Sequence, residues 1–92
     1  MIIEHQKLTN GGIFKAKQDH KEAGILTYFY DDEGKIVANH TFVHSEFSGR
    51  GVGKKMLMEL VKFVREEKLK IVAQCSFVAA LFDRIEEIRD VL

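Results

Sequence analysis

The sequence predicts an α/β fold: a mixed sheet of antiparallel strands, followed by a parallel strand–helix–strand unit and a closing helix. Two observations predict this class. Apolar and polar residues partly alternate as far as residue 43, as in half-buried strands, and the apolar period changes from 2 to 3.6 after Gly53. With 92 residues the chain is expected to form one domain over 1–92, because a chain this short builds a single hydrophobic core.

The first half of the chain is expected to form two hairpins. Turn-forming residues, TNGG in the first hairpin and DDEG in the second, separate runs rich in branched and aromatic residues. The expected strands are residues 2–8, 13–18, 24–31 and 35–43.

The fourth expected strand carries apolar residues on both faces. Regular alternation places His40 with Ile36 and Phe42 on one face, and Val37 with Val43 on the other. We therefore expect a central strand that is covered on both sides.

A helix is expected from residue 51 to 68, followed by a strand over 69–75. The helix would bury one face, made of Gly53, Met56, Leu57, Leu60, Val61 and Val64. A crossover of this length predicts that the strands ending at Val43 and Cys75 run parallel, directly adjacent or with one strand between them. Ser76 is the expected N-cap of a closing helix with its inward face at Phe77, Ala80, Leu81 and Ile85.

Composition excludes several classes of function. Fourteen basic and fourteen acidic residues leave no net charge, so a general nucleic-acid binder is not expected. No apolar run approaches the roughly 20 residues that span a bilayer. The single cysteine and the absence of a secretory signal predict a reducing, cytoplasmic setting, and the scattered histidines show no metal-ligand spacing.

Three glycines at alternate positions, Gly49, Gly51 and Gly53, stand where the last hairpin strand leads into the helix. A glycine-rich turn at a helix N-terminus is a physical anion site, because free N–H groups and the helix dipole meet there. The Walker A pattern fails, since it needs glycine at 48 and Ser or Thr at 55. The dinucleotide pattern G-x-G-x-x-G fails as well, because no third glycine follows at the required spacing.

The segment SGRGVG, residues 48–53, resembles the acetyl-coenzyme A pattern Q/R-x-x-G-x-G/A of the GNAT acetyltransferases, with Ser48 departing from its first position. The resemblance is sharper to a group of very small GNAT-like proteins that share three motifs in order. Those motifs are HTFV at 40–43, GRGVGKKM at 49–56 and LKIVAQCSFV at 69–78. The resemblance implies a minimal GNAT-like fold and an N-acetyltransferase that uses acetyl-coenzyme A as cosubstrate.

The resemblance also implies a layout for the site. The pyrophosphate of coenzyme A would lie on the backbone amides of Arg50, Gly51, Val52, Gly53 and Lys54, with Lys54 and Lys55 as point charges. The pantetheine arm would pair with backbone near Phe42 and Val43, between two parallel strands. The thioester would then lie near the strand ends that carry His40 and Cys75.

His40 and Cys75 are the candidate catalytic residues. A cysteine at a strand end before a helix N-terminus is placed where the dipole stabilises a thiolate, so Cys75 is either a transient acyl acceptor or a wall of the site. His40 is the first candidate for the base that deprotonates the amine, with His44 and Glu46 as alternatives. The closing helix lacks the tyrosine that serves as the acid in typical GNAT enzymes.

The acceptor is expected to be an amine, and the short chain predicts an open acceptor surface that suits a large substrate such as a protein. The rival interpretation is a coenzyme A binding or adaptor module without turnover, which Ser48 and the missing tyrosine favour. A nucleic-acid binder that uses the basic helix face is weaker, because glutamates interrupt that face.

Overall fold

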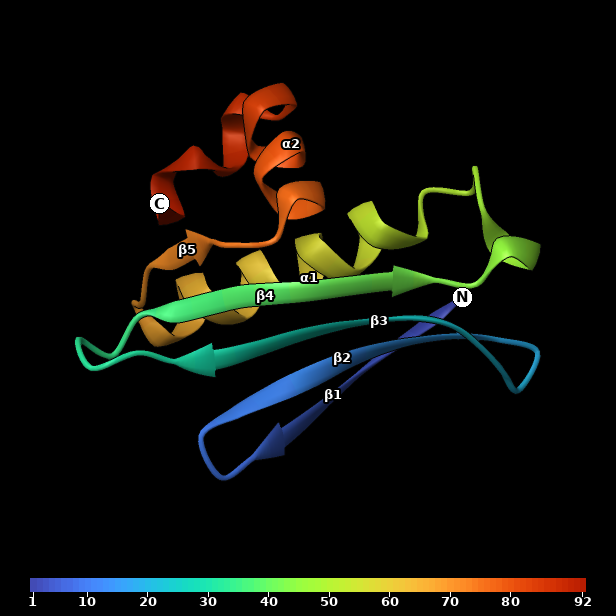
Figure 1. Cartoon of the computed structure of the whole chain (residues 1–92), viewed down its shortest axis with the longest axis horizontal. Helices are drawn as coiled ribbons and strands as arrows, with labels where there is room; N and C mark the ends of the chain where they lie inside the picture. Colours follow the sequence, from blue (N-terminus) through green and yellow to red (C-terminus); the bar gives the residue numbers. More distant parts are fainter.

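The computed structural model describes residues 1–92 and contains one five-stranded sheet, ordered as in the sequence, with helices packed against it (Figure 1). The strands are β1 (Ile2–Leu8), β2 (Gly11–Gln18), β3 (Lys21–Tyr30), β4 (Ile36–Val43) and β5 (Ile71–Ala73). The helices are α1 (Val52–Glu67) and α2 (Ser76–Arg84), with short 3-10 segments η1 (Ser45–Phe47) and η2 (Glu86–Val91). The predicted mixed α/β class is confirmed.

Strands β1 to β4 form an antiparallel meander that contains both predicted hairpins. The expectation that Gly11 and Gly12 belong to the first turn is wrong, because both residues pair with β3, opposite Phe29 and Tyr28. β3 likewise begins at Lys21, three residues earlier than expected, because its first residues pair with the end of β2.

Helix α1 lies along one face of the sheet, and its predicted buried face is confirmed. The six expected inward residues are all buried, together with Val52. All of them except Gly53 share one core cluster with residues of the sheet, α2 and η2, which places these helical segments on a common side of the sheet. No helix of the structure has the combination of length and apolar character that crossing a membrane requires.

Strand β5 pairs directly and in parallel with β4, which is one of the two predicted arrangements. Its expected range of 69–75 is too long, because the ladder ends at the Ala38 and Ala73 pair. Beyond it, the amides of Gln74 and Cys75 both donate to the Ala38 carbonyl, at 3.1 and 2.9 Å. The chain turns away at that point, so β4 continues without a partner on this edge.

A β-bulge at Asn39 corrects the face assignment of β4. Ala38 lies opposite Tyr28 and His40 lies opposite Thr27, so Asn39 is an extra residue and alternation reverses after it. Ile36 and Ala38 are buried on the α1 side, but His40 and Phe42 lie on the opposite face, where both are exposed. We call this opposite side of β1 to β4 the open face.

The closing helix is displaced by one residue from the prediction. Its N-cap is Cys75 and not Ser76, and its buried residues are Val78, Leu81 and Phe82. The expected inward positions Phe77 and Ala80 are exposed, whereas Ile85 is partly buried against the core. Segment η2, which was not expected, buries Ile88 and Val91 and completes the core.

Shortening Leu60 to alanine tests the core contact between α1 and the sheet. Leu60 is fully buried, so Leu60→Ala is expected to lower the free energy of unfolding by about 2–5 kcal/mol. Met58, on the same helix with 37% of its surface exposed, is the control, and Met58→Ala should change that free energy by less than about 0.5 kcal/mol. Urea unfolding measures both, and equal losses would contradict the assigned faces.

Candidate functional site

The loop after β4 is shaped by one buried aromatic residue and two glycines. Phe47, at the end of η1, is buried and anchors the loop. Gly49 and Gly51 have φ of 78° and 72°, in the left-handed region that other residues adopt at a cost. Gly51 is the N-cap of α1, so the left-handed turn delivers the chain directly into the helix.

Six consecutive amides in this loop and the first helical turn are free. The N–H groups of residues 49–54 donate to no backbone or side-chain acceptor, and the first helical bond runs from the Lys55 amide to the Gly51 carbonyl at 3.0 Å. The first turn of α1 also holds no acidic side chain. Free amides at a helix N-terminus attract an anion, so the loop is built to receive one.

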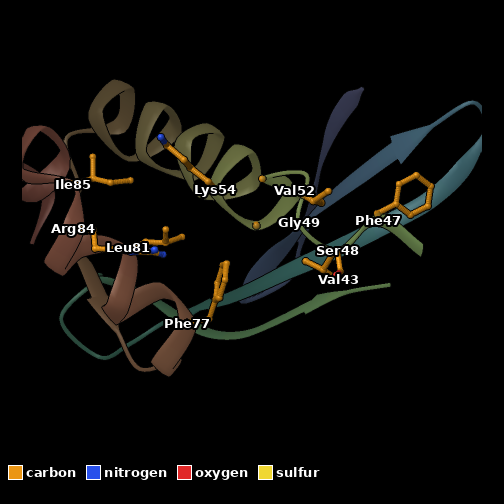
Figure 2. A pocket seen from close by; sticks show the side chains of 12 residues that line it. Val43, Phe47, Ser48, Gly49, Val52, Lys54, Phe77, Leu81, Arg84 and Ile85 are labelled. Carbon is orange, nitrogen blue, oxygen red and sulfur yellow. The ribbon is translucent and has the colours of Figure 1, made fainter. Parts of the chain in front are cut away.

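A cleft of about 700 Å³ opens beside these amides, between α1 and α2 (Figure 2). This volume lies within the range of roughly 300–1,000 Å³ typical of small-molecule sites. Half of the lining residues are hydrophobic, as expected for a cleft that takes a partly apolar ligand. The lining consists of Val43, Phe47, Ser48, Gly49, Gly51, Val52, Gly53, Lys54, Phe77, Leu81, Arg84 and Ile85.

The charges at the cleft are positive and unpaired. Lys54 and Arg84 are its only charged lining residues, and neither makes a salt bridge. Arg50 and Lys55 are also without an acidic partner, and the Arg50 guanidinium carbon lies 5.4 Å from the Phe47 ring centroid. Free amides and unpaired cations together favour a ligand that carries several negative charges.

Cys75 lies at the point where β4 and β5 separate. Its sulfur is 3.6 Å from Thr41 Oγ1, within hydrogen-bond reach. Burial alone would raise the pKa of the Cys75 thiol, but the Val78 amide and the Thr41 hydroxyl, then the Phe77 and Thr41 amides, lower it below its ordinary value. The helix amides make no hydrogen bond of ordinary geometry to the sulfur, so their effect is electrostatic.

The structure brings some of the predicted site residues together and separates others. Val43, Gly51, Val52, Gly53 and Lys54 line the cleft. The side chains of Arg50 and Lys55 flank it without lining it, and that of Phe42 lies on the open face with 47% exposure.

The two candidate catalytic side chains lie on opposite sides of the sheet. Thr41, which contacts Cys75, pairs with the core residue Leu26, whereas His40 pairs with Thr27 on the open face. The expectation that His40 shares a face with Ile36 is therefore wrong, and the bulge at Asn39 is the reason.

The alternative base His44 also lies beside the open face. Its ring packs edge-on against Phe42 at 4.8 Å between centroids, and Nε2 is 3.1 Å from Glu22 Oε2. The structure brings together no group of three or more His, Cys, Asp or Glu side chains that could hold a metal ion.

Sequence reasoning missed several residues of the site, most of which line the cleft. Arg84 had a detectable signal, because it lies one helical turn beyond Leu81, a residue expected to face inward. Thr41 had none, because its position next to Cys75 depends on the bulge. The other residues missed are Phe47, Ser48, Gly49, Phe77, Leu81 and Ile85.

Comparison with known proteins identifies a matching family and similar structures. The profile of a family described as GCN5-related N-acetyl-transferase matches residues 13–91. The structure resembles a GCN5-like protein of Staphylococcus aureus assigned as an N-acetyltransferase, with a TM-score of 0.74 and 34% identity over 96% of this chain and 85% of that one. No curated protein sequence matches.

Two more distant structures share the fold. A ribosomal-protein-alanine N-acetyltransferase of Brucella melitensis has a TM-score of 0.62 at 17% identity, over 83% of this chain and 61% of that one. An aminoglycoside acetyltransferase from an uncultured soil metagenomic sample has a TM-score of 0.62 at 21% identity, over 84% of this chain and 57% of that one. The chain thus spans about three fifths of these two proteins. With the family profile covering most of its length, the chain belongs to the GCN5-related N-acetyltransferase (GNAT) family.

Proposed function

We propose that the protein binds acetyl-coenzyme A and transfers its acetyl group to an amine. The observation that carries this proposal is the run of six free amides from Gly49 to Lys54, which suits the pyrophosphate of the coenzyme. Lys54 and Arg84 would neutralise further phosphate charge, and the apolar lining would accept the pantetheine arm. Family membership supports both the cosubstrate and the reaction class.

The pantetheine arm would continue from the cleft to the gap between β4 and β5. The β4–β5 ladder ends at Ala38, so the backbone of β4 around Phe42 and Val43 has an unpaired edge toward the gap. A chain of amide groups such as pantetheine can pair with that edge much as a strand would. The thioester would then lie close to Cys75 and Thr41.

The reaction needs an amine that attacks the thioester carbonyl. The C–N bond forms, the C–S bond breaks, the amine loses a proton, and coenzyme A leaves as a thiolate that takes up a proton. Backbone N–H groups on the free edge of β4 would stabilise the oxyanion. His40, on the open face, would accept the amine proton directly or through water. Cys75 would border the thioester as a wall or as a transient acyl acceptor.

The acceptor would approach over the open face. Neither α1 nor α2 covers this side of the sheet (Figure 1). Ile2 and Phe42 keep 66% and 47% of their surfaces exposed on it. A broad, shallow surface suits a large acceptor such as a protein amine better than a small one that needs enclosure. We further propose that residues 1–92 form one domain and work in the cytoplasm, where the unpaired Cys75 stays reduced.

One observation favours a coenzyme-binding module without turnover as the second candidate. Helix α2 carries Phe77 and Phe82 but no tyrosine that would protonate the departing thiolate. Such a module would bind acetyl-coenzyme A and never release free thiol.

A charged side chain in the amide loop should abolish the proposed pyrophosphate contact. Gly51→Asp is expected to weaken acetyl-coenzyme A binding about tenfold or more, because it sets a carboxylate against the phosphates. Gly34→Asp is the matched control, since Gly34 also has a positive φ, of 77°, and lies in the remote β3–β4 turn. Calorimetry measures the affinity of both variants for acetyl-coenzyme A, and equal affinities would contradict the proposed pyrophosphate contact.

The surroundings of Cys75 predict a thiol that ionises readily. Because the thiolate is the reacting form, the rate of alkylation by iodoacetamide should rise with pH through a midpoint below the ordinary value of about 8.5. Thr41→Val removes one stabilising hydroxyl and should move that midpoint upward. A wild-type midpoint at or above the ordinary value would contradict the described environment.

A turnover assay distinguishes an acetyltransferase from a coenzyme-binding module without turnover. With a panel of amines, including lysine-containing peptides, wild-type protein should release free thiol from acetyl-coenzyme A. His40→Asn should slow this release by roughly 100-fold or more. His20→Asn, in the β2–β3 turn, is the control and should keep the wild-type rate. Tight binding of acetyl-coenzyme A without release of free thiol would instead support the coenzyme-binding module without turnover.

A further inference from the structure

The cleft that holds the free amides stops short of Cys75. Phe77 is among its lining residues, but neither Cys75 nor Thr41 is. Phe77 is the lining residue nearest to Cys75 along the chain, so its ring lies at the end of the cleft that leads toward the thiol.

The ring of Phe77 rests directly on Gly53. A Cβ atom added to Gly53 would lie 2.3 Å from two atoms of this ring, far inside van der Waals contact. The ring thus reaches from α2 to the first turn of α1, and Figure 2 shows it projecting into the cleft between them. It touches α1 beside the amides proposed to hold pyrophosphate.

Phe77 is not a core residue, although it is aromatic. It keeps 40% of its surface exposed, and the buried face of α2 is made by Val78, Leu81 and Phe82. The fold therefore does not require the ring in its present position.

One turn along the same helix, the apolar lining of the cleft would offer the ring a second position. Leu81 and Ile85 follow Phe77 at intervals of four residues and also line the cleft. Side chains four apart on a helix are neighbours, so a change of rotamer would carry the ring from Gly53 toward Leu81 while it keeps apolar contact.

We propose that Phe77 is a gate between the amide loop and Cys75, closed by its contact with Gly53 and opened when the ring swings toward Leu81. This inference rests on the proposed function, because the gate would admit the pantetheine arm. The thioester would reach Cys75 only after the gate has moved.

The reactivity of Cys75 reports on the gate without any coenzyme. A bulky aromatic maleimide that enters through the cleft should alkylate Cys75 slowly in the wild type and faster in Phe77→Ala. If the open state is populated at about a tenth or less, the rate rises about tenfold or more. Phe77→Leu should give an intermediate rate, and Leu8→Ala, an exposed apolar residue on β1, should give the wild-type rate.

A double-mutant cycle tests the Gly53 contact itself. Gly53→Ala should displace the ring and speed alkylation in the wild-type background, yet add nothing in Phe77→Ala. Circular dichroism and thermal unfolding establish that each variant is folded. An unchanged rate in folded Phe77→Ala, or a Gly53→Ala effect that persists without the ring, would overturn the gate.

Binding of acetyl-coenzyme A to the same variants separates this inference from the proposed function. The gate predicts faster association of acetyl-coenzyme A with Phe77→Ala than with the wild type, and unchanged binding of inorganic pyrophosphate. If wild-type protein binds no acetyl-coenzyme A while Phe77→Ala still speeds alkylation, the proposed function fails and the gate stands. If acetyl-coenzyme A binds but association and alkylation do not change in Phe77→Ala, the gate alone fails.

Discussion

The Ala38 carbonyl sets the geometry on which the rest of the site depends. By accepting the amides of both Gln74 and Cys75, it ends the β4–β5 ladder and turns the chain into α2. The bulge at the next residue, Asn39, reverses the faces of β4 at the same level. Together they open a gap in the sheet with Thr41 and Cys75 on the helix side and His40 on the open side. A regular, fully paired β4 would leave no such gap.

This arrangement divides the proposed chemistry between two sides of one strand. The helix side holds the amide loop, the cleft and a thiol with a lowered pKa, all suited to an anionic thioester. The open side holds His40 and Phe42 and has no covering helix. Donor and acceptor would thus approach the gap from different directions and need not compete for one pocket. With no tyrosine in α2, the departing thiolate of the proposed reaction would take its proton from solvent.

Sequence alone was enough for the elements with strong periodicity. The face of α1 was predictable because six inward positions recur at helical spacing. Crossover length predicted that β4 and β5 run parallel but left open whether they are adjacent. The face of the sheet on which His40 lies was not predictable. A one-residue bulge moves every later side chain to the opposite face, and the residue types around Asn39 do not reveal it. The position of Phe77 was also hidden, since an aromatic residue at this helix position predicted burial, whereas its ring lies in the cleft against Gly53. The glycines indicated an anion site, but the number of free amides required the hydrogen-bond pattern.

The central claim is that the amides from Gly49 to Lys54 hold the pyrophosphate of acetyl-coenzyme A. Backbone amide NMR shifts, followed during titration with acetyl-coenzyme A, test this most directly, because each of the six groups gives its own signal. If these amides hold the pyrophosphate, we expect large downfield shifts at all six, as for new hydrogen bonds to phosphate, and smaller changes at Val43 and Phe77. Binding that leaves the six signals in place, or no binding at all, would contradict it.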